Sequence, residues 1–364
     1  MKKKLFALFL AGVMGLSLAA CGGGGDTKTE ESAAPEETVA EESAAPEAEA
    51  EAPAEDAEAD TAAADADGKE LNVNVILKTT ASEYWGYVVA GAKAYNADHP
   101  NVKVEVQGAS SETAYDEQLN IIETNLDSGQ YDGFVIAPLQ ADMVTTLISG
   151  KTVPIIAVDT NIETAEVLSF VGTGNENAAY EGGKKAVELA KAAGWEELNA
   201  IAISGVEGDS TVSARLSGYQ KGIEEAGGTF LADETQYADA VADKAFASME
   251  AIMQNHPEGV AMIVCNNDDM AIAAARAAAS NEAYKNTVFV GFDGIQSACE
   301  AILAGEETMS VAQNAYEMGY KAVETCVQAI NGETVEKFID SGNHMVTIDN
   351  AQEQLDTLKG YLGE

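Results

Sequence analysis

The sequence is poor in the side chains on which most catalytic and nucleic-acid-binding sites depend. Its 364 residues include only 3 histidines, and 20 basic side chains stand against 61 acidic ones, for a formal net charge of −41. A surface this acidic repels phosphate backbones, so nucleic-acid binding is excluded as a function class. Two of the histidines, His99 and His256, directly precede prolines. That pair is typical of a turn, so histidine catalysis has few candidates.

Cysteine is also scarce, with 4 in the whole chain. That number cannot form a disulfide scaffold, and the spacing does not match a zinc site. No calcium loop of the D-x-[DN]-x-[DN]-G form is present, so we expect no metal and no cofactor. Cys265 ends a strand-like run and is expected to be buried. Cys299 and Cys326 lie in helical stretches and can pair only if the fold brings them together.

The apolar run at the N-terminus, Leu5–Ala20, is short for a membrane span and follows three lysines. A basic head before a short apolar run predicts a secretory signal over residues 1–20. The run ends in Leu18-Ala19-Ala20-Cys21-Gly22, which resembles the lipobox of bacterial lipoproteins. The resemblance implies cleavage before Cys21, lipidation of its thiol and attachment to the outer face of the cell membrane. The alternative is an ordinary signal peptide with an incidental cysteine.

Large apolar side chains are almost missing from the next segment, residues 21–70. Residues 22–70 hold 17 acidic and 2 basic side chains, and Val39 is the only large apolar residue between Asp26 and Asp67. Such a segment cannot form a core, and its like charges keep it extended. We therefore expect a disordered acidic tether that holds a folded module away from the membrane.

From Leu71 onward, short apolar runs alternate with stretches of helical periodicity. The strand-like runs are Leu71–Leu77, Val102–Val106, Gly133–Ala137, Pro154–Val158, Ala200–Ser204, Ala261–Cys265, Val288–Gly291 and Met309–Ala312. The helical stretches are Tyr84–Ala97, Ala114–Asp127, Ala178–Ala193, Val212–Ala226, Lys244–Asn255, Met270–Ala279 and Tyr316–Ile330. This alternation predicts an α/β fold with parallel sheets. The number of units exceeds one open sheet, so we expect two doubly wound lobes.

Polar side chains follow most of the predicted strands, where parallel sheets bind their ligands. They are Lys78, Ser82, Asp159, Arg215, Asn267, Asp293 and Gln313, with the rings of Tyr84 and Trp85 beside them. Planar carboxylate, amide and guanidinium groups pair with neighbouring sugar hydroxyls, and aromatic faces pack on sugar CH groups. The pattern therefore predicts a sugar site.

Each of these residues also has a structural alternative. Asp159 or Asp293 could cap a helix or brace a turn, and Asn267 could form an Asx turn. Tyr84 and Trp85 could be core aromatics, and Arg215 could pair with a surface acid. The joint pattern favours the sugar site.

Six blocks of sequence, in order along residues 71–349, resemble the periplasmic-binding-protein type 1 family of sugar-binding components of ABC importers. They are Tyr84-Trp85 with Gly91-Ala92, Pro154–Asp159, Ala214–Tyr219, Cys265–Ala271, Val290–Gly294 and Val311–Gln313. The resemblance implies that Tyr84 and Trp85 sandwich a sugar ring with a partner from the other lobe. The resemblance also implies that the hydroxyl groups of the sugar form hydrogen bonds with Asp159, Arg215, Asn267, Asp293 and Gln313.

Three departures make ribose itself doubtful. Thr160 follows Asp159 where ribose-binding members carry an arginine, and Ser82 stands at the position of their first-loop asparagine. The second-lobe aromatic of the family falls on Ala240. Another pentose, a hexose or a polyol-like ligand remains open, as does Lys78 as a replacement contact.

The resemblance also implies the domain organisation and the mechanism. Lobe 1 comprises residues 71–173 and 314–341, and lobe 2 comprises 174–313 and 342–364, joined by a three-strand hinge with the ligand in the cleft between them. The lobes close on a monosaccharide, and the closed form docks on the permease subunits of an ABC importer. The chain is expected to be a monomer outside the cytoplasm, held to the membrane by its lipid.

Other classes of function fit the sequence less well. A dehydrogenase needs a third glycine after Gly172-Thr173-Gly174, and an α/β hydrolase needs a G-x-S-x-G elbow, which is absent. The one histidine outside a turn, His344, lies near the C-terminus. A transcriptional regulator of this fold needs a basic helix-turn-helix in place of the lipobox. A lipoprotein that senses a ligand and signals to a membrane receptor stays open as the alternative function.

Overall fold

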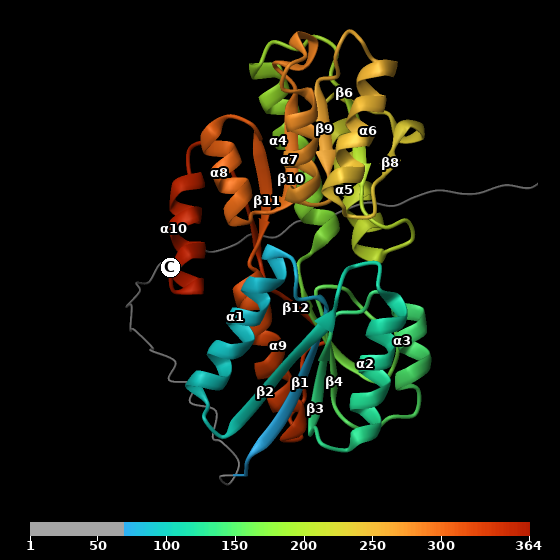
Figure 1. Cartoon of the computed structure of the whole chain (residues 1–364), viewed down its shortest axis with the longest axis vertical. Helices are drawn as coiled ribbons and strands as arrows, with labels where there is room; N and C mark the ends of the chain where they lie inside the picture. The colour runs from blue at the N-terminus through green and yellow to red at the C-terminus, as the bar shows by residue number, and fades with distance from the viewer. Residues whose placement is uncertain (1–68) are drawn as a thin grey trace, which may run out of the picture. The chain divides into compact units, whose positions relative to one another are not determined.

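Two separate sheets form the framework of residues 69–364, the part of the chain that the computed structural model describes (Figure 1). The predicted signal peptide, the lipid attachment at Cys21 and the acidic tether lie outside these residues. Among the described helices, none is long and apolar enough to cross a membrane.

The first sheet has six strands, all parallel, in the order β12-β5-β4-β3-β1-β2. They are β1 (Leu71–Thr79), β2 (Val102–Ala109), β3 (Gly133–Ile136), β4 (Ile155–Val158), β5 (Val167–Gly172) and β12 (Phe338–Asp340). Helices α1 (Glu83–Asp98) and α9 (Ala315–Ile330) cover one face, and α2 (Tyr115–Ser128) and α3 (Ala141–Ile148) cover the other. Central β1 is buried on both faces, as its almost unbroken apolar run predicts. This sheet and its helices are called lobe 1.

The second sheet has seven strands and forms lobe 2. They are β6 (Asn199–Ser204), β7 (Thr229–Phe230), β8 (Gln236–Tyr237), β9 (Met262–Cys265), β10 (Val288–Asp293), β11 (Met309–Gln313) and β13 (Asn343–Val346). Only β13 runs antiparallel, along β11. Helices α4 (Asn175–Ala192) and α5 (Ser210–Glu225) cover one face, and α6 (Ala242–Asn255) and α7 (Asp268–Ala278) cover the other.

Two further helices lie at the side of this second sheet. Helix α8 (Gln296–Ala304) packs against the C-terminal helix α10 (Ala351–Leu362), which also reaches α1 of lobe 1. The ring of Tyr361 on α10 stacks on Tyr316 of α9, with centroids 4.1 Å apart and planes 8° apart. Helix α10 therefore contacts both lobes.

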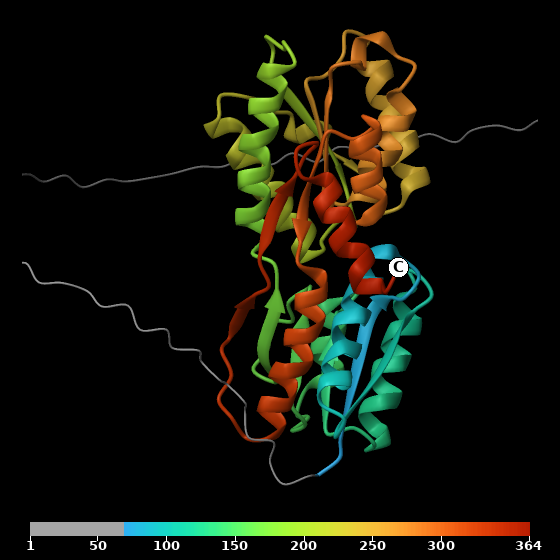
Figure 2. The ribbon, with the colours of Figure 1, turned by 90° about the vertical axis from the view of Figure 1, so that its left-hand side faces the viewer.

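The chain passes between the sheets three times, at 173–174, at 314 and at 341–342 (Figures 1 and 2). Two of the crossings are joined to each other, because the side-chain amide of Asn314 donates to the Ser341 carbonyl oxygen at 3.0 Å. Gly342 has φ +85°, a conformation that favours glycine. The two lobes and their three connections confirm the predicted fold class.

Helices α1 and α9 approach each other through a reciprocal pair of glycines. A Cβ at Gly91 would lie 1.9 Å from the Tyr316 carbonyl oxygen, and one at Gly319 would lie 2.1 Å from that of Val88. The two backbones therefore touch where any side chain would separate them. This contact fixes α1, which carries Tyr84 and Trp85 at its N-terminal end.

We expect Gly91→Ala to lower the free energy of unfolding by about 1–3 kcal/mol, because the new methyl group overlaps a backbone carbonyl that cannot move alone. Gly86→Ala on the same helix is the matched control, since nothing lies within 4 Å of its Cβ position. It should raise the free energy of unfolding by up to about 1 kcal/mol through helix propensity. Urea unfolding measures both, and equal effects of the two substitutions would contradict the glycine contact.

Candidate functional site: a charged cavity between the lobes

The carboxyl ends of the strands of both sheets face one cavity. It contains about 490 Å³ of space not filled by atoms, part of it open to solvent. Its lining comes from both lobes: Lys78, Tyr84, Trp85, Glu112 and Asp159 from lobe 1, and Gly205, Val206, Asp209, Thr211, Val212, Arg215, Ala240, Asn266, Asn267, Asp293 and Gln313 from lobe 2. Its place between the lobes, where the strands of both sheets end, makes it the candidate ligand site.

Eight of the nine residues that the sequence predicts for the site line this cavity. Ser82 does not: it precedes α1 as its N-cap residue, and its side chain makes no capping hydrogen bond. The prediction that Ser82 contributes a contact therefore finds no support in the position of its side chain. Ala240 lies in the wall, at the position where the family resemblance places an aromatic ring.

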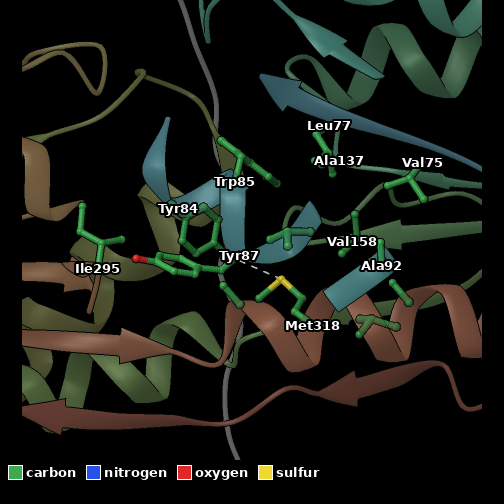
Figure 3. Close-up of a cluster of buried hydrophobic side chains, with 14 of the residues drawn as sticks. Val75, Leu77, Tyr84, Trp85, Tyr87, Ala92, Ala137, Val158, Ile295 and Met318 are labelled. Atoms are coloured by element: carbon green, nitrogen blue, oxygen red, sulfur yellow. Dashed lines mark hydrogen bonds between the residues drawn. The ribbon is translucent and has the colours of Figure 1, made fainter. Parts of the chain in front are cut away.

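The lobe 1 wall is built from two rings and a carboxylate. Tyr84 and Trp85, in the first turn of α1, meet edge to face with centroids 5.1 Å apart. The Tyr84 hydroxyl donates to Asp159 Oδ1 at 2.8 Å and also lies 3.6 Å from Met318 Sδ, which anchors it to α9 (Figure 3). Thr160 Oγ1 donates to the other oxygen of Asp159 at 2.8 Å. Burial and the neighbouring Asp159 raise the pKa of Tyr84, so its hydroxyl stays a donor.

The lobe 2 wall is organised by Arg215, which is 7 % exposed. Its Nε donates to Asn175 Oδ1 at 2.7 Å, and its Nη1 donates to the Asn266 carbonyl oxygen at 2.6 Å. The guanidinium lies over the Phe292 ring, 3.8 Å from the centroid, and Nη1 is 3.8 Å from Asp293 Oδ1. Arg215 is therefore a fixed planar group in the cavity wall and not a partner of a surface acid.

Asp293 ends β10 beside Arg215. Gln313 Nε2, at the end of the neighbouring strand β11, donates to Asp293 Oδ1 at 2.7 Å. Burial raises the pKa of Asp293, and the Arg215 cation opposes that effect only in part. Asp159 and Asp293 both have positive φ, +62° and +119°, so each carboxylate lies at a sharp change of chain direction where its strand ends.

Two asparagines after β9 complete the wall. Asn267 is the N-cap of α7, and its side-chain oxygen accepts from the Met270 N–H at 3.0 Å. Asn266 is buried, its oxygen accepts from the Gly205 N–H at 3.0 Å, and its Nδ2 has no hydrogen-bond partner among residues 69–364. Asn267 therefore has both the capping role and a place in the cavity, and Asn266 keeps a spare donor.

The sequence analysis missed two carboxylates of the site. Glu112, in the loop after β2, accepts from Trp85 Nε1 at 3.0 Å. Asp209 is the N-cap of α5 and accepts from the N–H groups of Thr211 and Val212 at 2.8 and 3.1 Å. Neither residue directly follows a strand, which was the main signal for the predicted candidates. The N-cap pattern Asp209-Ser210-Thr211 before a helical stretch could have located the second.

The ion pair between Lys78 and Asp209 bridges the two lobes, with Nζ 2.9 Å from Oδ2 and both side chains less than 10 % exposed. Burial by itself lowers the pKa of Lys78 and raises that of Asp209, but the attraction between them outweighs it. The pKa of Lys78 therefore lies above its ordinary value, and the pKa of Asp209 lies below. The ammonium stays charged and is bound by the protein itself.

The site thus holds four carboxylates and two cations, and protein groups bind both cations. Such an arrangement offers planar acceptors and donors to hydroxyl groups. Within residues 69–364 no cluster of three or more His, Cys, Asp or Glu residues is suited to hold a metal ion. Cys265, Cys299 and Cys326 are all buried and free, so the possible pair of the last two does not form.

Comparison with known proteins assigns this architecture to a family. The family described as "Periplasmic binding protein domain" matches residues 73–334. The D-allose-binding periplasmic protein of Escherichia coli is 27 % identical over 265 residues, which cover 70 % of this chain and 83 % of that protein. The ribose import binding protein of the same organism is 30 % identical over 206 residues, which cover 56 % of this chain and 67 % of that protein.

A solved structure leads to the same class. It is a carbohydrate transporter solute-binding protein from Agrobacterium radiobacter in complex with D-arabinose. It is 26 % identical, has a TM-score of 0.71, and the match covers 79 % of this chain and 98 % of that one. The chain belongs to the periplasmic binding protein family, and these relatives of it are named as binding proteins for sugars.

We expect Lys78→Met to destabilise the protein by about 3–5 kcal/mol near neutral pH, because it leaves Asp209 buried without its cation. The carboxyl pKa of Asp209 is lower in the folded chain than in the unfolded one. Its contribution is therefore complete above the ordinary carboxyl range and is lost as the pH falls. The difference between the parent chain and the variant should shrink as the pH falls below the ordinary carboxyl value of 3.8.

Urea unfolding at several pH values measures this difference. The matched control is Lys69→Met, which removes the exposed pair of Lys69 with Asp132 and should change stability little. A difference for Lys78→Met that stays constant with pH would show that the lost stability comes from packing and not from the ion pair.

Proposed function

We propose that this protein captures a monosaccharide in the cavity between its lobes and delivers it to the permease of an ABC importer. The observation that carries the proposal is the convergence of Tyr84, Trp85, Asp159, Arg215 and Asp293 on one cavity, from both lobes. Two rings on one side and planar hydrogen-bonding groups around them match the two kinds of surface that a sugar presents.

The groups of the site have distinct roles toward such a ligand. Asp159 and Asp293 accept hydrogen bonds from hydroxyls, and Arg215 and the spare Nδ2 of Asn266 donate to hydroxyl oxygens. Each charge-assisted bond contributes about 1.5–3 kcal/mol once the lobes exclude water. Several of them, less the ordering costs, are enough for micromolar binding, about −8 kcal/mol.

The lining also bears on which sugar is bound. The relatives that match are named for D-allose and ribose, and the matching solved structure holds D-arabinose. This chain has Ala240 in the wall and no contact from Ser82, and its Lys78 is bound by Asp209. We therefore propose that the ligand is a pentose, a hexose or a related polyol, and that ribose fits this cavity less well than related sugars do.

The proposal extends to the location and motion of the chain. Residues 1–20 are a signal peptide, Cys21 carries the lipid, and residues 21–70 are the tether to the outer face of the membrane. Lobe 1 consists of residues 71–173 and 314–341, and lobe 2 of 174–313 and 342–364. They rotate about the three crossings, so that the closed form is the form the permease binds.

Asp293→Ala should weaken sugar binding by tenfold or more, because it removes a carboxylate that accepts hydroxyl hydrogen bonds at the end of β10. The measurement is a thermal-shift screen of the parent chain against monosaccharides, with polyols, nucleosides and amino acids for comparison, followed by calorimetry on the best sugar. A ligand that binds only the folded state raises the melting temperature.

Asp349→Ala serves as the control, because Asp349 is an exposed carboxylate outside the cavity. Its sugar affinity should equal that of the parent chain. A nucleoside or an amino acid as the best ligand would overturn the sugar proposal and leave the fold intact. An unchanged affinity in Asp293→Ala would remove Asp293 from the site.

Lipidation of Cys21 has its own test. In bacterial cells fed a clickable fatty acid, the parent chain should be labelled and should sediment with membranes, whereas Cys21→Ser should lose both properties. Cys326→Ser is the control, because its thiol is buried in lobe 1 and is not expected to carry lipid. Equal labelling of the parent chain and Cys21→Ser would contradict the lipoprotein proposal.

A further inference from the structure

Asp293 adopts a backbone conformation that a non-glycine residue does not hold without support. Its φ of +119° lies outside the left-handed helical region, which makes it more strained than Asp159 at +62°. Strain of this kind costs on the order of 1–3 kcal/mol and persists only where surrounding contacts fix the chain. The contacts that fix this turn therefore decide where the Asp293 carboxylate points.

The two residues after Asp293 are held by one pair of side chains. The N–H of Gly294 donates to Ser310 Oγ at 3.0 Å, and the N–H of Ile295 donates to Asp268 Oδ2 at 3.0 Å. The Ser310 hydroxyl in turn donates to Asp268 Oδ1 at 2.5 Å. Both oxygens of Asp268, which is 0 % exposed, are thus used to hold the turn.

A second buried carboxyl group lies against Asp268. Glu307 is 2 % exposed, and neither of its carboxyl oxygens has a hydrogen-bond partner among residues 69–364. The position of a Cβ on Gly291 would lie 2.1 Å from Asp268 Oδ1 and 2.3 Å from Glu307 Oε1, so the glycine makes room for both groups. The two carboxyl groups therefore share one small space beside β10.

Apart from Arg215, the titratable groups around this pair are acids. The titratable groups that face it are Asp269, Asp293, Tyr219, Cys265 and Cys299, with Arg215 on the far side of Asp293. Burial and the neighbouring carboxylates raise the pKa of both Asp268 and Glu307. Hydrogen bonds from Ser310 and Ile295 favour the ionised form of Asp268 in part. The proton is therefore held more tightly by Glu307, which lacks these bonds.

We propose that Asp268 is a positioning residue that aims the Asp293 carboxylate at the sugar, and that Glu307 is kept as a neutral acid beside it. This rests on the proposed function, because it assigns Asp268 a role through a sugar contact. A neutral Glu307 favours the ionised form of Asp268, which accepts the hydrogen bonds of the turn. If both groups were ionised, their repulsion would loosen the loop that carries Asp293.

The test is a double-mutant cycle on the full chain, with D-allose, D-ribose and D-arabinose as probes. For the sugar of these three that binds the parent chain most tightly, Asp268→Asn should weaken binding about tenfold at neutral pH. In the Asp293→Ala background the same substitution should change binding less than about twofold, because the residue it positions is gone. Equal losses in both backgrounds would overturn the positioning role, as would no loss in either.

If Asp268→Asn fails to fold, Ser310→Ala carries the same cycle, since it removes the acceptor of the Gly294 N–H. Glu307→Gln replaces a neutral acid by a neutral group of the same shape, so it should keep the parent affinity within about twofold at neutral pH. A loss as large as that of Asp268→Asn would show that Glu307 acts in its ionised form.

The pH profile gives a readout that simple loss of packing does not move. A carboxyl group with a raised pKa stabilises the folded chain at low pH, and this stability is lost as the pH rises. The stability of Glu307→Gln relative to the parent chain should therefore increase as the pH rises above the ordinary carboxyl value, near 4.5. A difference that does not change with pH would overturn the neutral-acid assignment.

Amide hydrogen exchange separates the failure of this inference from the failure of the proposed function. Asp268→Asn should speed exchange at Gly294 and Ile295 with no sugar present, and leave the amides of β1 unchanged. If none of the three sugars binds the parent chain, the proposed ligand class fails. Faster exchange at Gly294 and Ile295 would still support the role of Asp268 in holding the turn. Unchanged exchange at the turn would overturn it whatever the sugars do.

Discussion

Placing six ionisable side chains in one cavity is the constraint on which the rest of this structure depends. Charges taken out of water are tolerated only when each finds a partner, and here one ion pair takes its two members from different lobes. Lys78 ends β1 in lobe 1, and its partner Asp209 begins α5 in lobe 2. Arg215 is held by a backbone carbonyl and an asparagine oxygen. The position of one lobe on the other is therefore tied to the charges between them.

Most of the strands could be predicted from the sequence, because short apolar runs are typical of strands that are buried on both faces of a sheet. All eight predicted strand runs lie in β1, β2, β3, β4, β6, β9, β10 and β11. The missed strand β5 contains Ser169, which interrupts its apolar run although it is buried. Strands β7 and β8 have two residues each, and the pairing of β12 with β5 depends on residues far away in the sequence. No local pattern can contain such pairings.

The site was predictable to the extent that its side chains follow strands. Asp159, Asp293 and Gln313 lie where parallel topology puts them, and the sequence order alone locates them. Glu112 and Asp209 reach the cavity from a loop and a helix N-terminus, so only the folded chain brings them there. Ser82 precedes α1 by one residue and yet lies outside the lining. Asp268, in the first turn of α7, is fully buried beneath the Asp293 turn, and no local pattern in the sequence marks that contact.

The stacked pair of Tyr316 and Tyr361 has a mechanical consequence. Helix α10 packs on α8 of lobe 2, and Tyr361 in its last turn stacks on Tyr316 of α9 in lobe 1. Two parallel rings resist separation more than sliding, so a rotation of one lobe on the other must shear this contact. The C-terminal helix thus connects the two lobes, and the overlap of the Tyr361 and Tyr316 rings depends on the angle between them.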